Sequence, residues 1–207
     1  MKLYYLIIIC ILSSLKLLSQ EKKVVYLNEF NQEISENEFK EGRTGKGILD
    51  LYFENDSIVK GLLVRKKSIG KLNENKFNKL KMSLSIENKI NDGLIVIIYY
   101  PGKDRCNDVK NYSTWNIFDK DYLKRLKRIS NVSHHWIYKN DENLNYYYQN
   151  KIGWKKDKNQ LIEKMFFKYH FPCASCVVLD TEGNFITYYS EFGKQTVWKM
   201  AKELKRI

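Results

Sequence analysis

The second half of the chain shows the most regular pattern of hydrophobic and polar positions. Residues 94–100 read LIVIIYY, a continuous run of β-branched and aromatic side chains that is typical of a strand buried on both faces. Over residues 112–129, apolar side chains recur at spacings of three and four, which predicts an amphipathic helix. This set comprises Trp115, Phe118, Tyr122, Leu126 and Ile129. A buried strand followed by such a helix indicates a layered α/β domain.

The pattern beyond this helix predicts further strands and helices. They are strands over 132–138, 176–179 and 185–189, and helices over 141–151, 159–169 and 196–207. The first two strands of the series are joined by a helical crossover and are expected to run parallel. The turn residues Glu182, Gly183 and Asn184 make a hairpin of the last two strands. The fold class predicted for residues 91–207 is therefore α/β, with a mixed sheet and helices on both faces.

Residues 21–90 are expected to form a small α/β extension in front of this domain. The expected elements are a strand over 24–27, a helix opened by the capping box of Ser35 and Glu38, a hairpin of 48–53 with 58–65, and a helix starting at Asn73 with Phe77, Leu80 and Leu84 on one face. The turn Asn91-Asp92-Gly93 is the predicted boundary, because these residue types favour a break in regular structure.

The first 20 residues have the layout of a secretory signal peptide. Lys2 precedes an unbroken apolar run over residues 3–12, and small and polar residues follow it up to Gln20. The run is too short for a comfortable membrane span. We therefore expect cleavage near residue 20, export to a periplasmic or extracellular location, and no stable membrane span in the mature chain.

The chain is strongly basic, with a formal net charge of +12 from 36 Lys and Arg against 24 Asp and Glu. Such a balance suits an anionic polymer or membrane surface, although only net charge supports that interpretation. The lysines are scattered along the whole sequence, and the tightest cluster, over residues 124–128, fits the solvated face of a helix. An exported protein also rarely meets nucleic acid, so nucleic-acid binding is not expected.

Three cysteines remain after signal removal: Cys106, Cys173 and Cys176. In an oxidising compartment two of them can pair and leave one thiol over. The Cys-x-x-Cys of residues 173–176 can close on itself only if its loop coils, because an extended spacing holds the two Cα atoms roughly 10 Å apart. Three thiols and one of His134, His135 or His170 could hold zinc, but no regular paired spacing supports this, and no metal or cofactor is expected.

Residues 90–207 resemble the thioredoxin superfamily in element order and in two local motifs. LIVIIYYPGKDRC resembles the thioredoxin strand that runs into its active-site loop, and CVVLDTEGNFITYYSEFGK resembles the family's last hairpin and the glycine before its final helix. The family places a Cys-x-x-Cys after the first strand, at a helix N-terminus, where the first thiolate attacks a disulfide and the second resolves it. Without gaps, Cys106 falls on the second of these positions and Lys103 on the first, and a shifted loop puts Cys106 on the nucleophile. Either way, one thiol is missing.

The resemblance also implies where a replacement thiol lies. The family has a cis-proline immediately before its third strand, facing the active-site loop, and here that position falls on Ala174 or nearby, two residues after Pro172. Cys173 or Cys176 would then lie close to Cys106, as a resolving cysteine or as half of a structural bridge. Cys173, in the loop, is the better candidate, and Cys176, at the start of an apolar strand, is expected to be buried and inert.

Two functions follow from the resemblance. The first is an exported thioredoxin-like module with a degenerate active site, which is non-catalytic or weakly redox-active and partners another envelope protein. The second is a thiol–disulfide oxidoreductase acting on protein thiols through Cys106 with Cys173 or Cys176. A peroxiredoxin is disfavoured, because Pro101 lies five residues before Cys106 instead of seven and no hydroxyl residue stands between them.

Overall fold

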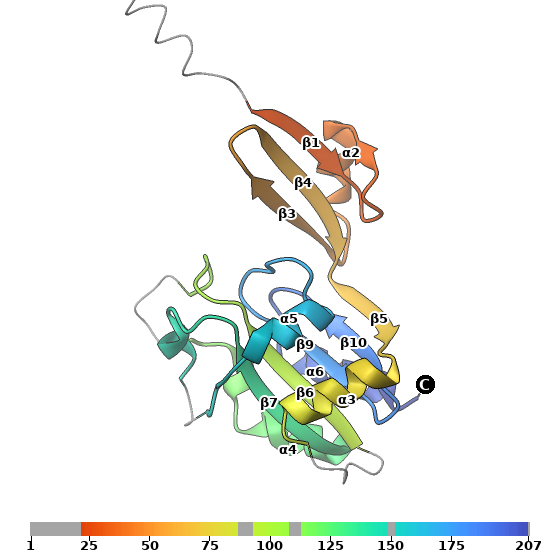
Figure 1. The fold of residues 1–207 in the computed structure, drawn as a ribbon, viewed down its shortest axis with the longest axis vertical. Coiled ribbons are helices and arrows are strands. Elements are labelled where there is room, and N and C mark those ends of the chain that lie inside the picture. Colours follow the sequence, from red (N-terminus) through yellow and green to blue (C-terminus); the bar gives the residue numbers. More distant parts are fainter. Residues whose placement is uncertain (1–21, 87–92, 108–112, 149–151, 207) are drawn as a thin grey trace, which may run out of the picture. The chain divides into compact units, whose positions relative to one another are not determined.

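The computed structural model describes residues 22–86, 93–107, 113–148 and 152–206 (Figure 1). The predicted signal peptide and the turn residues Asn91 and Asp92 lie outside these ranges. The chain is a mixed α/β protein with two mixed sheets, one in each of two compact units that divide after Arg65. No helix in the described ranges is long and apolar enough to cross a membrane.

The first unit is a four-stranded sheet with one helix. Its elements are β1 (Lys23–Leu27), β2 (Glu33–Ile34), α2 (Glu36–Gly42), β3 (Ile48–Glu54) and β4 (Ile58–Arg65), and the strand order is β2-β1-β4-β3. The predicted capping box is confirmed, since the Ser35 side chain accepts from the Glu38 amide and the Glu38 side chain accepts from the Ser35 amide. The hairpin of β3 and β4 is confirmed as well.

A glycine allows the helix of the first unit to lie close to its sheet. The Phe39 ring of α2 is buried and lies 4.6 Å from the Tyr26 ring of β1. A Cβ atom added at Gly61 of β4 would meet the Tyr26 ring at 2.8 Å and the Phe39 ring at 3.0 Å. Position 61 therefore carries no side chain because two aromatic rings already fill the space.

The second unit is built on a six-stranded sheet with the order β5-β10-β9-β6-β7-β8. Its elements are β5 (Lys67–Lys71), α3 (Glu74–Ser83), β6 (Gly93–Tyr100), η1 (Asn116–Phe118), α4 (Asp121–Ile129), β7 (Asn131–Tyr138), η2 (Leu144–Tyr147), β8 (Lys155–Lys156), η3 (Lys158–Gln160), α5 (Leu161–Phe166), β9 (Ser175–Leu179), β10 (Asn184–Tyr188) and α6 (Lys194–Leu204). The parallel pairing of β6 with β7 and the hairpin of β9 and β10 are both confirmed.

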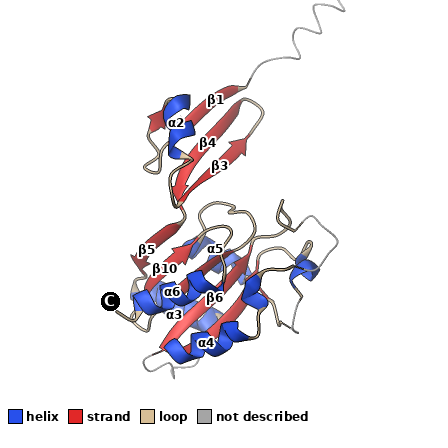
Figure 2. Ribbon diagram, turned by 180° about the vertical axis from the view of Figure 1, so that it is seen from behind, coloured by secondary structure: helices blue, strands red, loops and turns tan. Residues whose placement is uncertain are grey.

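Every residue of β6 is buried, because helices cover both faces of the sheet. Alternate side chains, from Leu94 to Tyr100, pack into a core under α4 and α6. The intervening side chains face the other way, where the Tyr99 ring stacks on Phe167 at a centroid distance of 4.7 Å and where α3 contacts α5. Figures 1 and 2 show these two helical layers from opposite sides. The continuous apolar run of β6 follows from this double coverage.

The boundary of the two units differs from the one expected at residue 91. Strand β5 pairs antiparallel with β10, with Ile69 opposite Ile186, and α3 contacts α5 of the second unit. Residues 66–86 therefore belong to the second unit. The predicted helix from Asn73 is confirmed, since the Asn73 side chain caps α3 and Phe77 and Leu80 are buried.

Three predicted helices are shorter than expected. The helix expected over 112–129 is divided, because Asp119 is extended and separates η1 from α4; residues 108–112 lie outside the described ranges. The segment 141–148 contains only the short η2, which starts after Asn143 in a left-handed conformation with φ 58°. The helix expected over 159–169 is confined to α5, whose first turn is capped by Asp157 through the amides of Ile162 and Glu163.

Candidate functional site

Two loops meet where β6 ends and β9 begins. The strands are antiparallel neighbours, with Tyr99 opposite Ser175, so the loop after β6 and the loop before β9 emerge side by side at the same end of these two strands. The first loop carries Cys106 and the second carries Cys173. These two residues form a disulfide across a separation of 67 residues, with their Cα atoms 5.0 Å apart.

The carboxylate of Asp104 holds both cysteines by their backbones. Its Oδ1 accepts a hydrogen bond of 2.8 Å from the Cys106 amide, and its Oδ2 accepts one of 2.6 Å from the Cys173 amide. Hydrogen bonds from amides to an ionised acceptor are stronger than those between neutral groups. Asp104 therefore fixes the two loops to each other independently of the covalent bond.

A buried asparagine, Asn107, is hydrogen bonded to the backbone of Asp104. The Asn107 side chain is fully buried; its Oδ1 accepts from the Asp104 amide at 3.1 Å, and its Nδ2 donates to the Gly102 carbonyl at 3.1 Å. The Asn107 carbonyl accepts from the Nδ2 of Asn143, at the start of η2. Because its side-chain amide makes these hydrogen bonds inside the protein, Asn107 fixes the shape of the loop and is not available to a ligand.

Cys173 lies in an unusual backbone conformation. Its φ is +73°, in the left-handed region that non-glycine residues rarely adopt, and the residue is 7 % exposed. Such a conformation costs on the order of 1 kcal/mol or more and persists where the surroundings enforce it. Here the bridge to Cys106 and the hydrogen bond to Asp104 supply that constraint. Cys106, in contrast, is only partly buried.

A pocket of about 460 Å³ opens beside the bridge. Its walls combine the disulfide with aromatic and charged side chains; they are Arg105, Cys106, Ser113, Thr114, Trp115, Tyr146, Tyr147, Cys173, Ala174, Glu191 and Phe192. The Trp115 ring stands edge-on to Phe192 at 4.8 Å and to Tyr147 at 5.8 Å, which gives the pocket a rigid aromatic wall. Small-molecule and peptide sites share this combination of apolar walls and a few polar groups.

The structure separates Cys176 from the other two cysteines. Cys176 is fully buried in β9, and its Sγ lies 4.0 Å from the Sδ of Met200 on α6, in the core of the unit. Burial raises the pKa of the Cys176 thiol far above its ordinary value. Cys176 is therefore an inert side chain of the core and does not reach Cys106.

Among the described residues, one group of side chains has the types and spacing of metal ligands. The Glu191 Oε1 lies 3.6 Å from the Cys173 Sγ, and Cys106, Cys173 and Glu191 place their ligand atoms within 4.8 Å of one another. The two sulfur atoms are bonded to each other, so neither is a thiolate. His134 is hydrogen bonded to Tyr122 and His135 to Ser133, away from this group.

Sequence reasoning singled out the three cysteines but missed Asp104 and the aromatic wall. The signal for Asp104 is its place two residues before Cys106, because an Asp side chain commonly accepts a hydrogen bond from the amide two residues later. The second bond, to Cys173, depends on contact between distant loops and has no local signal. The same holds for Trp115 and Phe192, which are 77 residues apart.

Comparisons with known proteins leave the chain without an identified family. No family model matches the chain, and no curated protein matches it. Among solved structures, the chain is similar to a futalosine hydrolase mutant of Helicobacter pylori strain 26695, with 9% identity, a TM-score of 0.18, and coverage of 90% of this chain and 96% of that chain. A likeness of this size carries no argument about fold or function.

Proposed function

We propose that the chain is an exported, thioredoxin-like binding module with a structural disulfide and no redox catalysis of its own. The order of β6, α4, β7, α5, β9, β10 and α6 in the second unit supports the resemblance to thioredoxin, as do the parallel first pair and the final hairpin. The apolar leader of residues 3–12 supports export. The pocket beside the bridge is the proposed binding site.

The observation that carries the proposal is that the Asp104 carboxylate accepts hydrogen bonds from the backbone amides of both cysteines. Thiol–disulfide exchange needs a thiolate, and reactive cysteines lie in electropositive surroundings. Here the Asp104 carboxylate lies against both backbones and the Glu191 carboxylate lies 3.6 Å from the Cys173 sulfur. The Glu191 carboxylate opposes formation of a thiolate at Cys173, and Asp104 holds the two backbones in place, which together favour the oxidised bridge as a fixed part of the pocket wall.

A thiol count tests this proposal directly. The mature protein is treated with a thiol reagent under native conditions and in denaturant, and its bridges are mapped by mass spectrometry. We expect no reaction in the native state, one thiol from Cys176 in denaturant, and a Cys106–Cys173 peptide. In a model assay for disulfide reduction or dithiol oxidation, the protein is expected to be inactive. Acceleration of either reaction would contradict a purely structural bridge.

A second candidate function is thiol–disulfide exchange with a partner protein. It is favoured by the partial exposure of Cys106 on the pocket wall, where an incoming thiolate has access to its sulfur. The partner's thiolate would bond to Cys106 Sγ while the bond to Cys173 breaks and Cys173 leaves as a thiolate. A second partner thiol would then attack the mixed disulfide and release Cys106, so the partner loses two electrons and the bridge gains them.

Trapping separates the two functions. In Cys173→Ser, the free Cys106 thiolate can attack the disulfide form of a protein that normally exchanges with it; it displaces one partner cysteine as a thiolate and retains the other in a mixed disulfide, because no internal thiol is left to release it. Cys106→Ser is the matched control, because its remaining Cys173 is buried. A mixed disulfide formed by the first variant and absent from the second would establish exchange. Its absence from both variants supports the binding module.

A further inference from the structure

The layer formed by α4 and α6 carries a concentration of unneutralised positive charge. The two helices pack against each other over one face of the six-stranded sheet (Figure 2). Their exposed basic side chains are Lys124, Arg125, Lys127 and Arg128 on α4, Lys199 and Lys202 on α6, and Arg206 just beyond it. The net charge that looked scattered in the sequence is thus partly gathered on one surface.

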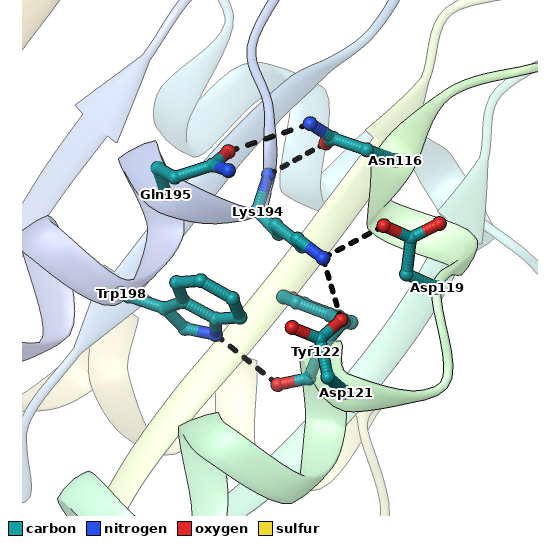
Figure 3. A network of polar contacts seen from close by, with 7 residues as sticks. All are labelled: Asn116, Asp119, Asp121, Tyr122, Lys194, Gln195 and Trp198. Atoms are coloured by element: carbon teal, nitrogen blue, oxygen red, sulfur yellow. Dashed lines mark hydrogen bonds and ion pairs between the residues drawn. The ribbon is translucent and has the colours of Figure 1, made fainter.

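The acidic groups of this layer are already engaged by two other lysines. Figure 3 shows Lys194, whose Nζ lies 2.7 Å from Asp119 Oδ2 and 2.6 Å from Asp121 Oδ1. Glu203 of α6 pairs with Lys67 of β5. In the part of the chain that the structure describes, no carboxylate pairs with Lys199, Lys202 or Arg206. These cations are therefore available to an external anion.

A groove between the two helices collects several of these cations. It has a volume of about 870 Å³, and five basic residues line it with two acidic ones: Arg125, Lys194, Lys199, Lys202 and Arg206 with Asp121 and Glu203. The Arg125 guanidinium lies 4.4 Å from the centre of the Trp198 ring, which fixes it at the groove. The Trp198 indole is held in turn by a 3.1 Å hydrogen bond to the Tyr122 carbonyl (Figure 3). The groove wall is consequently preformed.

An exposed leucine lies within the basic surface. Leu123 is 38 % exposed and lies one helical turn before Lys127, on the flank of α4 away from Arg125 and the groove. Helices that bind the surface of a bilayer combine Lys and Arg with exposed apolar side chains that enter the interface. A soluble polyanion would make use of the cations and would gain little from Leu123.

We infer that the α4–α6 face docks on a membrane surface rich in anionic phospholipid. The cations are spread over two neighbouring helices, as a flat array of headgroups requires, and each lysine or arginine near such a surface adds to the attraction. The phosphate of a headgroup fits the groove beside Arg125, since the guanidinium fork pairs with phosphate oxygens. The proposal does not depend on the binding pocket at the Cys106–Cys173 bridge.

Vesicle sedimentation tests the inference with a charge-matched control. The test variant replaces Lys124, Lys127, Lys199 and Lys202 with Gln, and the control replaces Lys76, Lys79, Lys156 and Lys158, which are exposed elsewhere on the same unit. The mature proteins are mixed with vesicles of pure phosphatidylcholine or of equal parts phosphatidylcholine and phosphatidylglycerol. We expect binding to the anionic vesicles alone, weakened about tenfold or more in the test variant and little changed in the control.

Salt dependence, heparin binding and smaller variants test the membrane proposal further. Raising the salt from about 0.1 M to about 1 M shortens the Debye length from about 10 Å to about 3 Å and is expected to release the protein. Equal weakening of both variants, or no binding to anionic vesicles, would overturn the inference. Binding to dissolved heparin without binding to vesicles would overturn it in favour of a soluble polyanion. If the fourfold variant fails to fold, K124Q/K127Q and K199Q/K202Q are tested separately, each with a smaller expected loss.

Discussion

Cys173 and Cys176 are three residues apart, yet they lie in two chemically different regions. Cys173 is in the rim, which we define as the loop after β6, with Asp104 and Cys106, together with the loop before β9. There Cys173 forms a disulfide with Cys106 and has a left-handed backbone conformation. Cys176 is in the interior, the core beneath α4 and α6, where it contacts Met200 and carries a free thiol. The rim is built from polar contacts and one covalent bond, whereas the interior is built from apolar packing.

This difference shows that the spacing of a Cys-x-x-Cys does not by itself define a redox pair. The start of β9 falls between the two cysteines, so one sulfur lies before the strand and the other within it. The strand pairs Cys176 with Ile98 of β6, and that pairing fixes the position of Cys176 in the core. The partner of Cys173 is then supplied by the neighbouring loop, 67 residues earlier in the chain.

Removing the bridge is expected to have the largest effect on the rim. In Cys106→Ser/Cys173→Ser, the unfolded chain regains the freedom of a 67-residue loop, which corresponds to about 4 kcal/mol of stability by chain entropy. Urea unfolding of the oxidised proteins measures the loss. Wild-type protein unfolded in the presence of a reductant is the control and should fall to the level of the double variant. Equal stability of all three samples would show that the bridge carries no folding energy.

The second largest effect is expected on acidification, which should lower the folding stability through His134, a residue packed against the interior. The ring of His134 lies against Tyr122 and Trp136, and burial lowers its pKa from 6.5 to about 3. The unfolded chain binds a proton below about pH 6.5, whereas folded His134 resists protonation down to about pH 3, so stability falls as the pH falls through this window. Between pH 7 and pH 5, the loss from His134 is about 1–2 kcal/mol.

The variant His134→Gln isolates that contribution. It removes the titrating ring and leaves a side chain that can still hydrogen bond to the Tyr122 hydroxyl, 2.8 Å from the His134 Nε2. Urea unfolding at pH 7 and pH 5 should show a smaller difference between the two pH values in the variant than in the wild type. The same pH dependence in both proteins would exclude His134 as its source.

Asp104→Asn is expected to lower the free energy of unfolding by about 1–2 kcal/mol, through weaker contacts in the rim. The variant loses the negative charge, and only one of its two side-chain atoms can accept a hydrogen bond, so the amide of Cys106 or Cys173 loses its acceptor. Denaturant unfolding measures the stability, and the rate of reduction by dithiothreitol measures the protection of the bridge, which should decrease. Asp141→Asn, at an exposed position, is the matched control and should behave as the wild type.

The sequence predicted those parts of the fold that depend on local pattern. The apolar run of β6, the turn at Gly183 and the capping box at Ser35 were all readable because each signal lies within a few residues. The sequence of β5, KSIGK, carries little apolar character, since the strand is at an edge of the sheet, and it was not recognised. That omission also displaced the expected boundary from residue 65 to residue 90.

The candidate site was predictable to the extent that the strand order was. Once β6 and β9 are neighbours, the meeting of their loops follows, and this places Cys106 near Cys173. The bond from the Cys173 amide to Asp104 and the position of Phe192 against Trp115 were not predictable, because these contacts join segments that are far apart in the sequence. The interruption of the expected helix at Asp119 lies beside another contact between distant segments, since the Asn116 Oδ1 accepts a hydrogen bond from the amide of Lys194 at the start of α6.

Cys176→Ala gives the smallest expected effect and the sharpest contrast with the rim. Deleting a buried sulfur that contacts Met200 leaves a small void in the core and should cost about 1 kcal/mol, because a free buried cysteine behaves as a small hydrophobic side chain. The thiol count of the denatured oxidised protein should fall from one to none, while the rate at which dithiothreitol reduces the bridge stays that of the wild type. A changed reduction rate would mean that the rim and the interior are coupled through β9. An unchanged rate, beside the faster reduction expected for Asp104→Asn, would show that the reactivity of the bridge is set by its polar surroundings alone.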